Sequence, residues 1–422
     1  MLELILKHLV ILFIAFLLSV NATTALSAKF VQLDEQQLQS AKALIQSGEA
    51  PLPTQDAYKK LLRDADALLK VKDFTVTDKE ILAPTGDAHD YVSISRYWWP
   101  DPSKKDGLPW VRHDGETNPD TQTDKVDRKR IGAMTKAVKT LSYAYYFSGN
   151  DAYAKKGVSM IKTWFLRPET KMNPHLQFAQ SVPGNNKSRR SGILDGRLIP
   201  LWVLDSIAIF AKSSHWTDLE QTQMNDWLDE YLTWLVDSKV GKKGAQQTNN
   251  HGSWYRFQTV TLSWYLDKHD ELAKQLSAAK TGLAKQLNKD GAQTHELSRT
   301  KSFFYSCFNL NAVTRTALIA DKVGDSLWAS PSIDSSSIEL AINYLVPAAN
   351  GESWPHPSKG VNATRLIPIL ERYTAHSDKP EYKALLTRLM KRAKEKASKG
   401  NYEARLIENM ALLNPSLLSE ID

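Results

Sequence analysis

The sequence predicts an all-α protein whose antiparallel helical hairpins close into an (α/α) toroid or incomplete barrel, with long polar loops around a cleft. Apolar residues recur at helical spacing along most of the chain, and no stretch shows the strict alternation of a strand. Polar, irregular segments separate the helical ones. Hairpins of this kind bury their apolar faces most simply by closing into a ring. A solenoid is the alternative, but a solenoid requires a repeat period that the sequence lacks.

The helical periodicity continues almost to the end of the chain. Gly48 and Pro51 end the first helix, and Thr217–Glu220 has the residues of a capping box that begins another. One face of that helix is predicted to be a core stripe rather than a cofactor site, through Leu219, Trp227, Tyr231 and Trp234. The predicted helices cover about residues 33–45, 58–69, 131–147, 152–165, 198–212, 219–234, 254–266, 271–287, 303–320, 338 onward, 362–373, 381–396 and 402–413.

The N-terminus has the order of a secretory signal peptide. Lys7 precedes an apolar run from Leu9 to Val20, and small residues follow as far as Ala28. The run is too short to span a membrane comfortably, although an uncleaved anchor is the alternative. We therefore expect residues 1–28 to be a signal peptide, cleaved between 22 and 28, and residues 29–422 to be a single toroid domain. The mature protein is expected to be periplasmic or secreted, without membrane contact.

Composition narrows the functional classes. The net charge of +7 favours an anionic partner, but the basic residues are scattered and no nucleic-acid motif is present, so nucleic acid is not expected. Cys307 is the single cysteine, which excludes an intramolecular disulfide and a cysteine-based zinc cluster, and we expect it to be buried. The sequence has no HExxH, Walker A, GxGxxG or GxSxG motif, and neither a metal nor a cofactor is expected.

The segment from Gln247 to Tyr255 combines amides, a histidine and aromatic rings. Asn250 can hold a carboxylate, His251 can move a proton, and Trp254 and Tyr255 can stack on a sugar. The alternative is a loop of turn-forming residues with a structural histidine. A second pair, Arg299 and Tyr305, flanks an apparent helix start, where the cation favours the phenolate that proton transfer requires.

Long polar segments supply further candidates. Residues 84–119 show no helical period, and a loop of that length inside a compact domain is usually functional. Residues 172–192 and 354–357 interrupt the helices in the same way. The candidate substrate-binding residues in these segments are His89, Tyr91, Tyr97, Trp98, Trp99, Asn173, His175, Gln180, Arg189, Trp354 and His356.

Seven short motifs are specific for one protein family when taken together, although no single motif would be. They are Gly86–Tyr91, Tyr97–Pro102, Gly107–Trp110, Asp114–Pro119, Met172–Pro174, Asn249–Tyr255 and Arg299–Ser306. Over residues 84–373 the sequence resembles the alginate-lyase-type polysaccharide lyases, a superfamily of secreted (α/α) toroids. The likeness is closer to relatives that cleave glucuronan and polymannuronate. His175, in place of an amide, and Arg189–Gly192, in place of a glycine-rich pattern, depart from the family.

The resemblance implies β-elimination on an anionic, 4-linked uronate polymer such as alginate, polymannuronate or glucuronan, with a 4,5-unsaturated product. The substrate carboxylate must be neutralised before the C5 proton can be removed. Asn250 is implied as the neutralising group and His251 as base or neutralising group. Tyr305 is implied as the acid for the leaving oxygen and a further candidate for the base, held by Arg299. No metal is required.

Two other functions fit the same sequence. An (α/α)-barrel glycoside hydrolase needs two carboxylates facing one cleft, and the available ones are Asp87, Asp90, Asp195 and Glu296. A non-catalytic periplasmic polysaccharide-binding protein needs only the binding residues. Formation of an unsaturated product distinguishes elimination from both.

Overall fold

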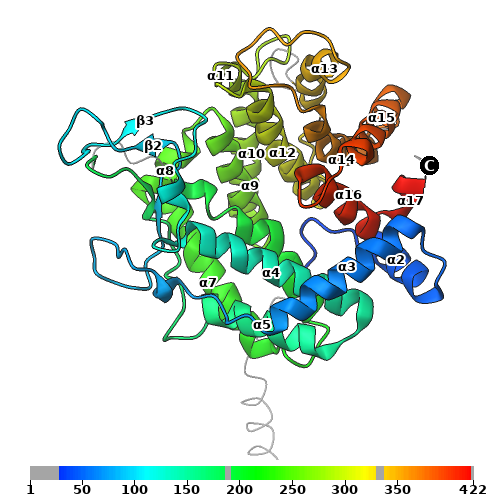
Figure 1. The fold of residues 1–422 in the computed structure, drawn as a ribbon, viewed down its shortest axis with the longest axis horizontal. Helices are drawn as coiled ribbons and strands as arrows, with labels where there is room; N and C mark the ends of the chain where they lie inside the picture. Colours follow the sequence, from blue (N-terminus) through cyan, green and yellow to red (C-terminus); the bar gives the residue numbers. More distant parts are fainter. Residues whose placement is uncertain (1–27, 186–191, 329–336, 420–422) are drawn as a thin grey trace, which may run out of the picture.

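A computed structural model gives the structure of residues 28–185, 192–328 and 337–419. The expected signal peptide lies almost wholly outside the described residues. Within them the chain is mostly helical, and its helices follow one another around a ring (Figure 1). The predicted all-α toroid is confirmed. None of the helices in these ranges combines the length and the apolar character that a membrane crossing requires.

Most predicted helices are present, with ends that differ by a few residues. The first part of the ring contains α2 (Glu35–Ser47), α3 (Leu52–Leu69), α4 (Asp127–Ser148), α5 (Asp151–Phe165), α6 (Leu204–Phe210), α7 (Asp218–Asp237) and α8 (Lys239–Ala245). The second part contains α9 (Asn250–Tyr265), α10 (His269–Gln286), α11 (Thr294–Leu297), α12 (Ser302–Asp321), α13 (Ile338–Ala349), α14 (Ile367–His376), α15 (Pro380–Lys396), α16 (Tyr402–Leu413) and α17 (Pro415–Ser419).

Two helical segments differ from the prediction. The segment expected over 198–212 is a π-helical turn, η4 (Ile199–Val203), that leads into the short α6. α9 begins at Asn250 rather than at Trp254, because the Asn249 side chain caps the helix by accepting from the backbone N–H of His251 at 2.9 Å. Asn250 and His251 therefore lie in the first turn of a helix, not in a loop.

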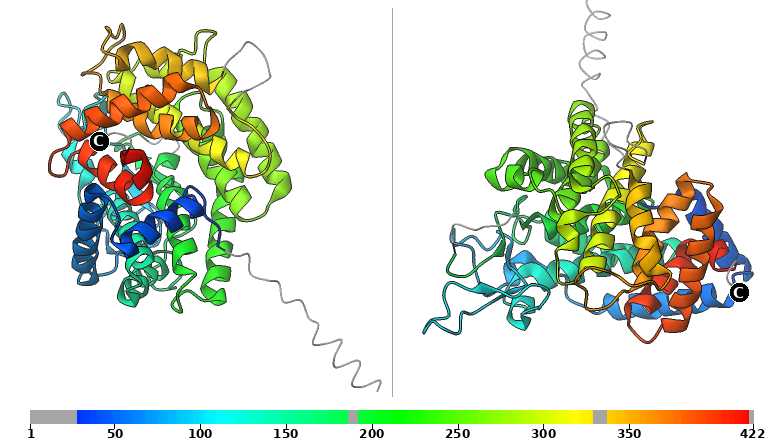
Figure 2. Two further views of the ribbon diagram at one scale, coloured as in Figure 1. Left: turned by 90° about the vertical axis from the view of Figure 1, so that its right-hand side faces the viewer. Right: turned by 90° about the horizontal axis from the view of Figure 1, so that it is seen from above.

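Helices from both ends of the chain meet to close the ring. α16 packs against α2 and α3, so the C-terminal part lies beside the N-terminal part (Figure 2). From α3 the contacts pass to α4, then through η4 to α9, on to α12 and α14, and through α15 back to α16. This closed order of contacts is the physical basis of the toroid.

Short strands join two of the polar segments, which the sequence pattern did not predict. β1 (Val92–Ile94) pairs in parallel with β4 (Phe178–Ser181), and β2 (Trp98–Trp99) pairs antiparallel with β3 (Val111–Arg112). These strands are too short to show an alternating pattern. The first pair fixes the segment 84–119 beside the segment 172–192 at one end of the toroid.

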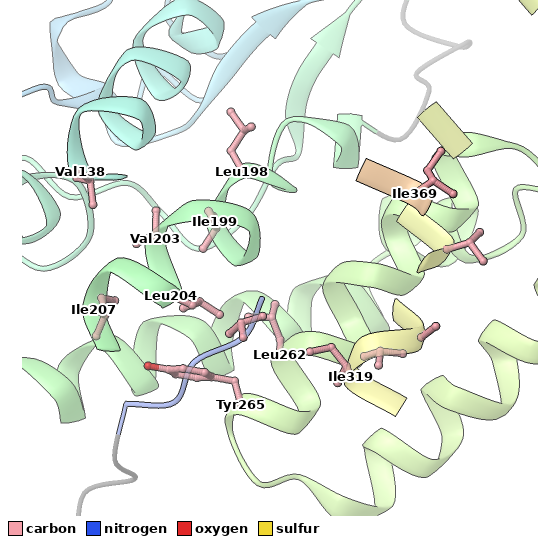
Figure 3. Packing of buried hydrophobic residues seen from close by; sticks show 14 of the residues in the cluster. Val138, Leu198, Ile199, Val203, Leu204, Ile207, Leu262, Tyr265, Ile319 and Ile369 are labelled. Atoms are coloured by element: carbon pink, nitrogen blue, oxygen red, sulfur yellow. The ribbon is translucent and has the colours of Figure 1, made fainter. Parts of the chain in front are cut away.

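One continuous apolar core, from Val31 to Leu418, fills the space between the helices. Figure 3 shows part of it, where Leu204 and Leu262 pack near Tyr265. Burying a side chain of this size contributes about 1.5–3 kcal/mol to folding.

The structure also tests three further predictions, on a helix cap, on the cysteine and on the core stripe of α7. The capping box at Thr217 is present, and Cys307 is buried. Trp227 and Tyr231 belong to the core as predicted, and Trp234 packs partly buried against it. Leu219 does not, because it is 64% exposed on the outer face of α7.

Candidate active site

A cleft of about 210 Å³ lies between the first turns of α9 and α12 and the polar segments joined by β1 and β4. Seven of the predicted site residues line it: Tyr97, Trp98, Gln180, Asn250, His251, Arg299 and Tyr305. They come from four separate parts of the sequence, and the fold brings them together.

Asn250 is held by a buried carboxylate. Both its backbone N–H and its side-chain Nδ2 donate to Glu296, at 2.6 Å and at 2.9–3.0 Å. Both residues are about 1% exposed. Burial raises the pKa of Glu296, while the hydrogen bonds from Asn250 oppose this rise. Glu296 therefore fixes the orientation of the Asn250 amide, whose nitrogen carries two hydrogens and can offer one to a ligand.

Tyr305 is held by a phenol and a guanidinium. Its hydroxyl donates to the Tyr97 hydroxyl at 2.7 Å, and the Arg299 guanidinium lies 3.7 Å from the centre of its ring. Arg299 favours the phenolate as predicted, but the net shift of the pKa is in the opposite direction. Burial raises the pKa of Tyr305 well above its usual value, Arg299 only partly offsets this, and Tyr97 raises it further. Tyr305 is therefore a protonated phenol at neutral pH.

Asp114 in the long polar segment positions Arg299. Its two carboxylate oxygens accept from Arg299 at 2.7 Å and 3.1 Å. Burial acts to raise the pKa of Asp114, but the hydrogen bonds and charge of Arg299 outweigh burial and hold that pKa well below its usual range. Neighbouring Gly115 has φ +76°, and a Cβ there would lie 2.5 Å from Oγ1 of Thr300. Only glycine allows the segment to approach this closely.

Asp195 is a second anchoring carboxylate, buried on the side of the cleft formed by Gln180 and Arg128. It pairs with Arg128 and accepts from Gln180 Nε2 at 2.9 Å and from the hydroxyl of Ser93 at 2.7 Å. Gln180 has φ +50°, a conformation that costs free energy for a residue with a side chain. Its backbone N–H donates to Ser93 at 2.8 Å, which helps to hold it there.

The cleft is strongly cationic. Five guanidinium groups line it, those of Arg96, Arg112, Arg128, Arg197 and Arg299. Asp195 is the one carboxylate among its described lining residues. Burial and the nearby Arg128 and Arg96 lower the pKa of Arg197, so the positive charges are crowded. No group of three or more His, Cys, Asp or Glu side chains suited to a metal occurs among residues for which the structure gives positions.

Three predicted substrate contacts are wrong. Trp254 is 1% exposed and packs against Phe257 and Phe308. Tyr255 is buried, with its hydroxyl bound to a backbone carbonyl of α7 at 3.2 Å. Tyr91 is fully buried, and its hydroxyl donates to Asp195 at 3.0 Å. Trp254 and Tyr91 support residues of the cleft from behind, Tyr255 belongs to the core, and all three rings are too deeply buried to stack on a sugar.

Three predicted residues form a separate polar group beside the cleft. Asn173 donates to Asp90 at 2.8 Å, the same carboxylate lies 3.1 Å from His175, and His89 binds the Lys171 carbonyl through Nδ1 at 2.6 Å. None of the three lines the cleft.

The remaining predicted residues also lie away from the cleft lining. Trp99 stacks on His113, and Trp354 donates to the Ser302 hydroxyl behind the start of α12, with His356 beside it. Arg189 is outside the described residues.

Sequence reasoning missed two parts of the site. Arg197 lies between Trp254 and Phe308, with its guanidinium 5.6 Å from each ring centre. The sequence feature that could have indicated Arg197 is its position as a basic residue directly before the apolar run of η4. Asp114 was part of a motif but had no assigned role, because its partner Arg299 is distant in the sequence.

Comparison with known proteins identifies the family. A family model described as alginate lyase matches residues 75–354. The chain belongs to the alginate lyase family. A comparison with curated proteins gave no match.

Solved structures agree with this alginate lyase assignment. An alginate lyase from Bacteroides ovatus is 34% identical, with a TM-score of 0.81, over 90% of this chain and 99% of that chain. Alginate lyase A1-III from Sphingomonas species A1 is 17% identical, with a TM-score of 0.51, over 82% of this chain and 89% of that one. The second likeness concerns the fold alone. As a member of the alginate lyase family, this chain is a polysaccharide lyase.

Proposed function

We propose that this polysaccharide lyase cleaves a 4-linked polyuronate, such as polymannuronate or glucuronan, by β-elimination and leaves 4,5-unsaturated ends. One observation carries the proposal: Asn250, His251, Arg299 and Tyr305 line a single cleft that is rich in guanidinium groups. A cationic cleft attracts a polyanion, and these four groups can supply carboxylate neutralisation and proton transfer.

The positions of these groups support the following reaction. The Asn250 amide and the guanidinium groups withdraw charge from the C6 carboxylate, which acidifies the C5 proton. His251 takes that proton, and the C5 electron pair forms the 4,5-double bond as the C4–O4 bond breaks. Tyr305 gives its proton to the leaving O4. Its raised pKa suits it to be this acid rather than the base.

The geometry favours elimination over hydrolysis. A glycoside hydrolase needs an acidic and a basic carboxylate facing its substrate. Asp195 is paired with Arg128, Glu296 is buried against Asn250, and Asp87 and Asp90 lie outside the described cleft lining.

A substrate panel tests the proposal. Polymannuronate, polyguluronate, glucuronan and hyaluronan would be incubated with the enzyme and followed at the ultraviolet band of the unsaturated product. We expect absorbance to rise with at least one 4-linked polyuronate. New reducing ends without absorbance would indicate hydrolysis, and binding without turnover would indicate a binding protein.

We further propose that the protein is exported to the periplasm or secreted, on the basis of the N-terminal Lys7 and apolar run. N-terminal sequencing of the protein recovered from its native compartment should begin between residues 23 and 29. An intact Met1 on cytoplasmic material would contradict export.

A further inference from the structure

The toroid contains a second cavity, of about 930 Å³, toward the other ends of the helices that carry the cleft. α12 reaches the cleft with Tyr305 and this cavity with Arg315, which lies about 15 Å further along the helix axis. α4 likewise contributes Arg128 to the cleft and Lys139 to the second cavity. We call this space the rear cavity, defined by Lys139, Trp202, Trp264, Arg315, Lys322 and Arg372.

Three cations of the rear cavity bind neutral acceptors. Lys139 donates to Asn409 Oδ1 at 2.7 Å, and Arg315 donates to Gln32 Oε1 at 2.7 Å. Arg372 donates to Asn311 Oδ1 at 2.6 Å. Among the described residues, none of these cations has a carboxylate within 4.0 Å, the ion-pairing distance. Gln32 Nε2 is also buried without an acceptor in the described part of the chain. Buried charges are normally paired, so this arrangement lacks an anion.

Four carboxylates also line the rear cavity, those of Asp34, Glu35, Asp205 and Glu371, and they offset its positive charge only in part because none of them forms an ion pair with Lys139, Arg315 or Arg372 among the described residues. Asp205 accepts from the backbone N–H groups of Val31 and Gln32, and burial raises its pKa to about 6. Burial also raises the pKa of Glu371. The pKa of Lys139 falls to about 8, through burial first and then the charge of Arg315, although the charge of Asp205 opposes this fall. The cations therefore repel one another, and a bound anion would relieve this repulsion.

Ring surfaces beside the charges indicate the class of anion. Trp202 and Phe30 line the rear cavity and are partly exposed, and a cavity of this volume is within the usual range for small-molecule sites. Guanidinium groups bind carboxylates well, and aromatic rings pack against sugar faces. We propose that the rear cavity binds a short uronate oligosaccharide, the class of product that the lyase reaction releases. The choice of a uronate as the bound anion rests on the proposed function.

Calorimetric titration with a mannuronate tetrasaccharide tests this site. The full chain carrying Tyr305→Phe would be used, because that substitution is expected to slow cleavage during the titration. We expect two sites per chain. Adding Lys139→Met should weaken one of them roughly tenfold or more, since it removes a charge-assisted contact, and leave the other unchanged. Lys136→Met, on an exposed turn of α4, is the matched control and should retain both sites.

Further arms keep the result decisive. A melting temperature confirms that Lys139→Met is folded, and Lys322→Gln, at an exposed position of the same cavity, should weaken the same site if the first variant is unstable. Neutral cellotetraose should not bind there. One site per chain, unchanged by Lys139→Met and Lys322→Gln, overturns the proposal, while the parent enzyme still cleaves polymannuronate. If the parent cleaves no polyuronate and neither site binds, the proposed function and this proposal both fall.

Discussion

The two walls of the cleft are positioned by different parts of the molecule. Asn250 is fixed by the buried Glu296 of the short helix α11. Arg299 and Tyr305 are instead fixed by Asp114 and Tyr97, which belong to the long polar segment with only short strand pairs. The α9 wall, formed by Asn250 and His251, therefore does not depend on segment 84–119, whereas the α12 wall, formed by Arg299 and Tyr305, is complete only when that segment is docked. Variants on each side should separate core stability from docking.

Tyr305→Phe should have the largest effect. It removes one hydroxyl and little volume, so we expect turnover to fall by roughly 10²-fold or more, the range for a positioned proton donor, with little change in affinity or melting temperature. Product absorbance and circular dichroism measure these. A folded variant nearly as fast as the parent would remove Tyr305 from the mechanism and transfer the acid role to His251, because His89 does not line the cleft.

Asn250→Ala tests the α9 wall. Loss of carboxylate neutralisation should lower turnover by roughly 10²-fold, and His251→Ala should do the same through loss of the base. If these residues were only structural, residual activity would follow the folded fraction in a thermal melt, and that result would contradict the assignment.

Asp114→Asn should have an intermediate effect that is specific to the α12 wall. The charge that fixes Arg299 is lost, so we expect about tenfold lower turnover and faster limited proteolysis within residues 84–119. Asp101→Asn is the control, because that exposed carboxylate binds only Ser103 in its own loop among the described contacts. Equal proteolysis of both variants would show that docking does not depend on Asp114.

Glu296→Gln should lower turnover by only a few-fold but change its pH dependence. In the parent, Glu296 gains a proton as the pH falls through its raised pKa and then accepts less well from Asn250, so turnover should fall on the acid side. The folded state holds this proton more tightly than the unfolded chain. Its contribution to stability is therefore complete below about pH 4.3 and lost as the pH rises through the folded-state pKa.

Opposite slopes of turnover and stability against pH are thus expected in the parent, and both should flatten in Glu296→Gln. A pH profile of turnover and pH-dependent melting temperatures provide the measurement. Identical profiles in parent and variant would show that another group causes the acid limb.

Salt should have the smallest effect. The guanidinium groups of the cleft attract a polyanion, so the apparent Michaelis constant should rise as the screening length falls below about 10 Å. Turnover at saturation should change little. A Michaelis constant that stays flat from low to moderate salt would argue against electrostatic guidance.

The helical period predicted the fold class and most helices, because each helix buries one face against the ring. It did not predict β1, β2, β3 or β4, which are stabilised by pairing between distant segments. It also placed Asn250 in a loop, because the asparagines, His251 and Gly252 are weak helix formers, and the Asn249 cap was not weighed against them.

For the site, motifs identified Asn250, His251, Arg299 and Tyr305 as a group, and the fold places all four on one cleft. Trp254 was wrongly assigned to the substrate, since proximity in sequence does not tell which face of a helix is buried. The pKa of Tyr305 could not be predicted either, because burial outweighs the cation and burial is a property of the whole fold.

α12 carries residues of both the cleft and the rear cavity, so the rotation of one end of the helix relative to the other is constrained. One inserted residue between Tyr305 and Arg315 would rotate one end against the other by about 100° and lengthen the helix by about 1.5 Å. Tyr305 and Arg315 would then no longer both face their cavities. α12 should therefore keep its length residue for residue between these two positions, and a one-residue insertion there should disturb both cavities together.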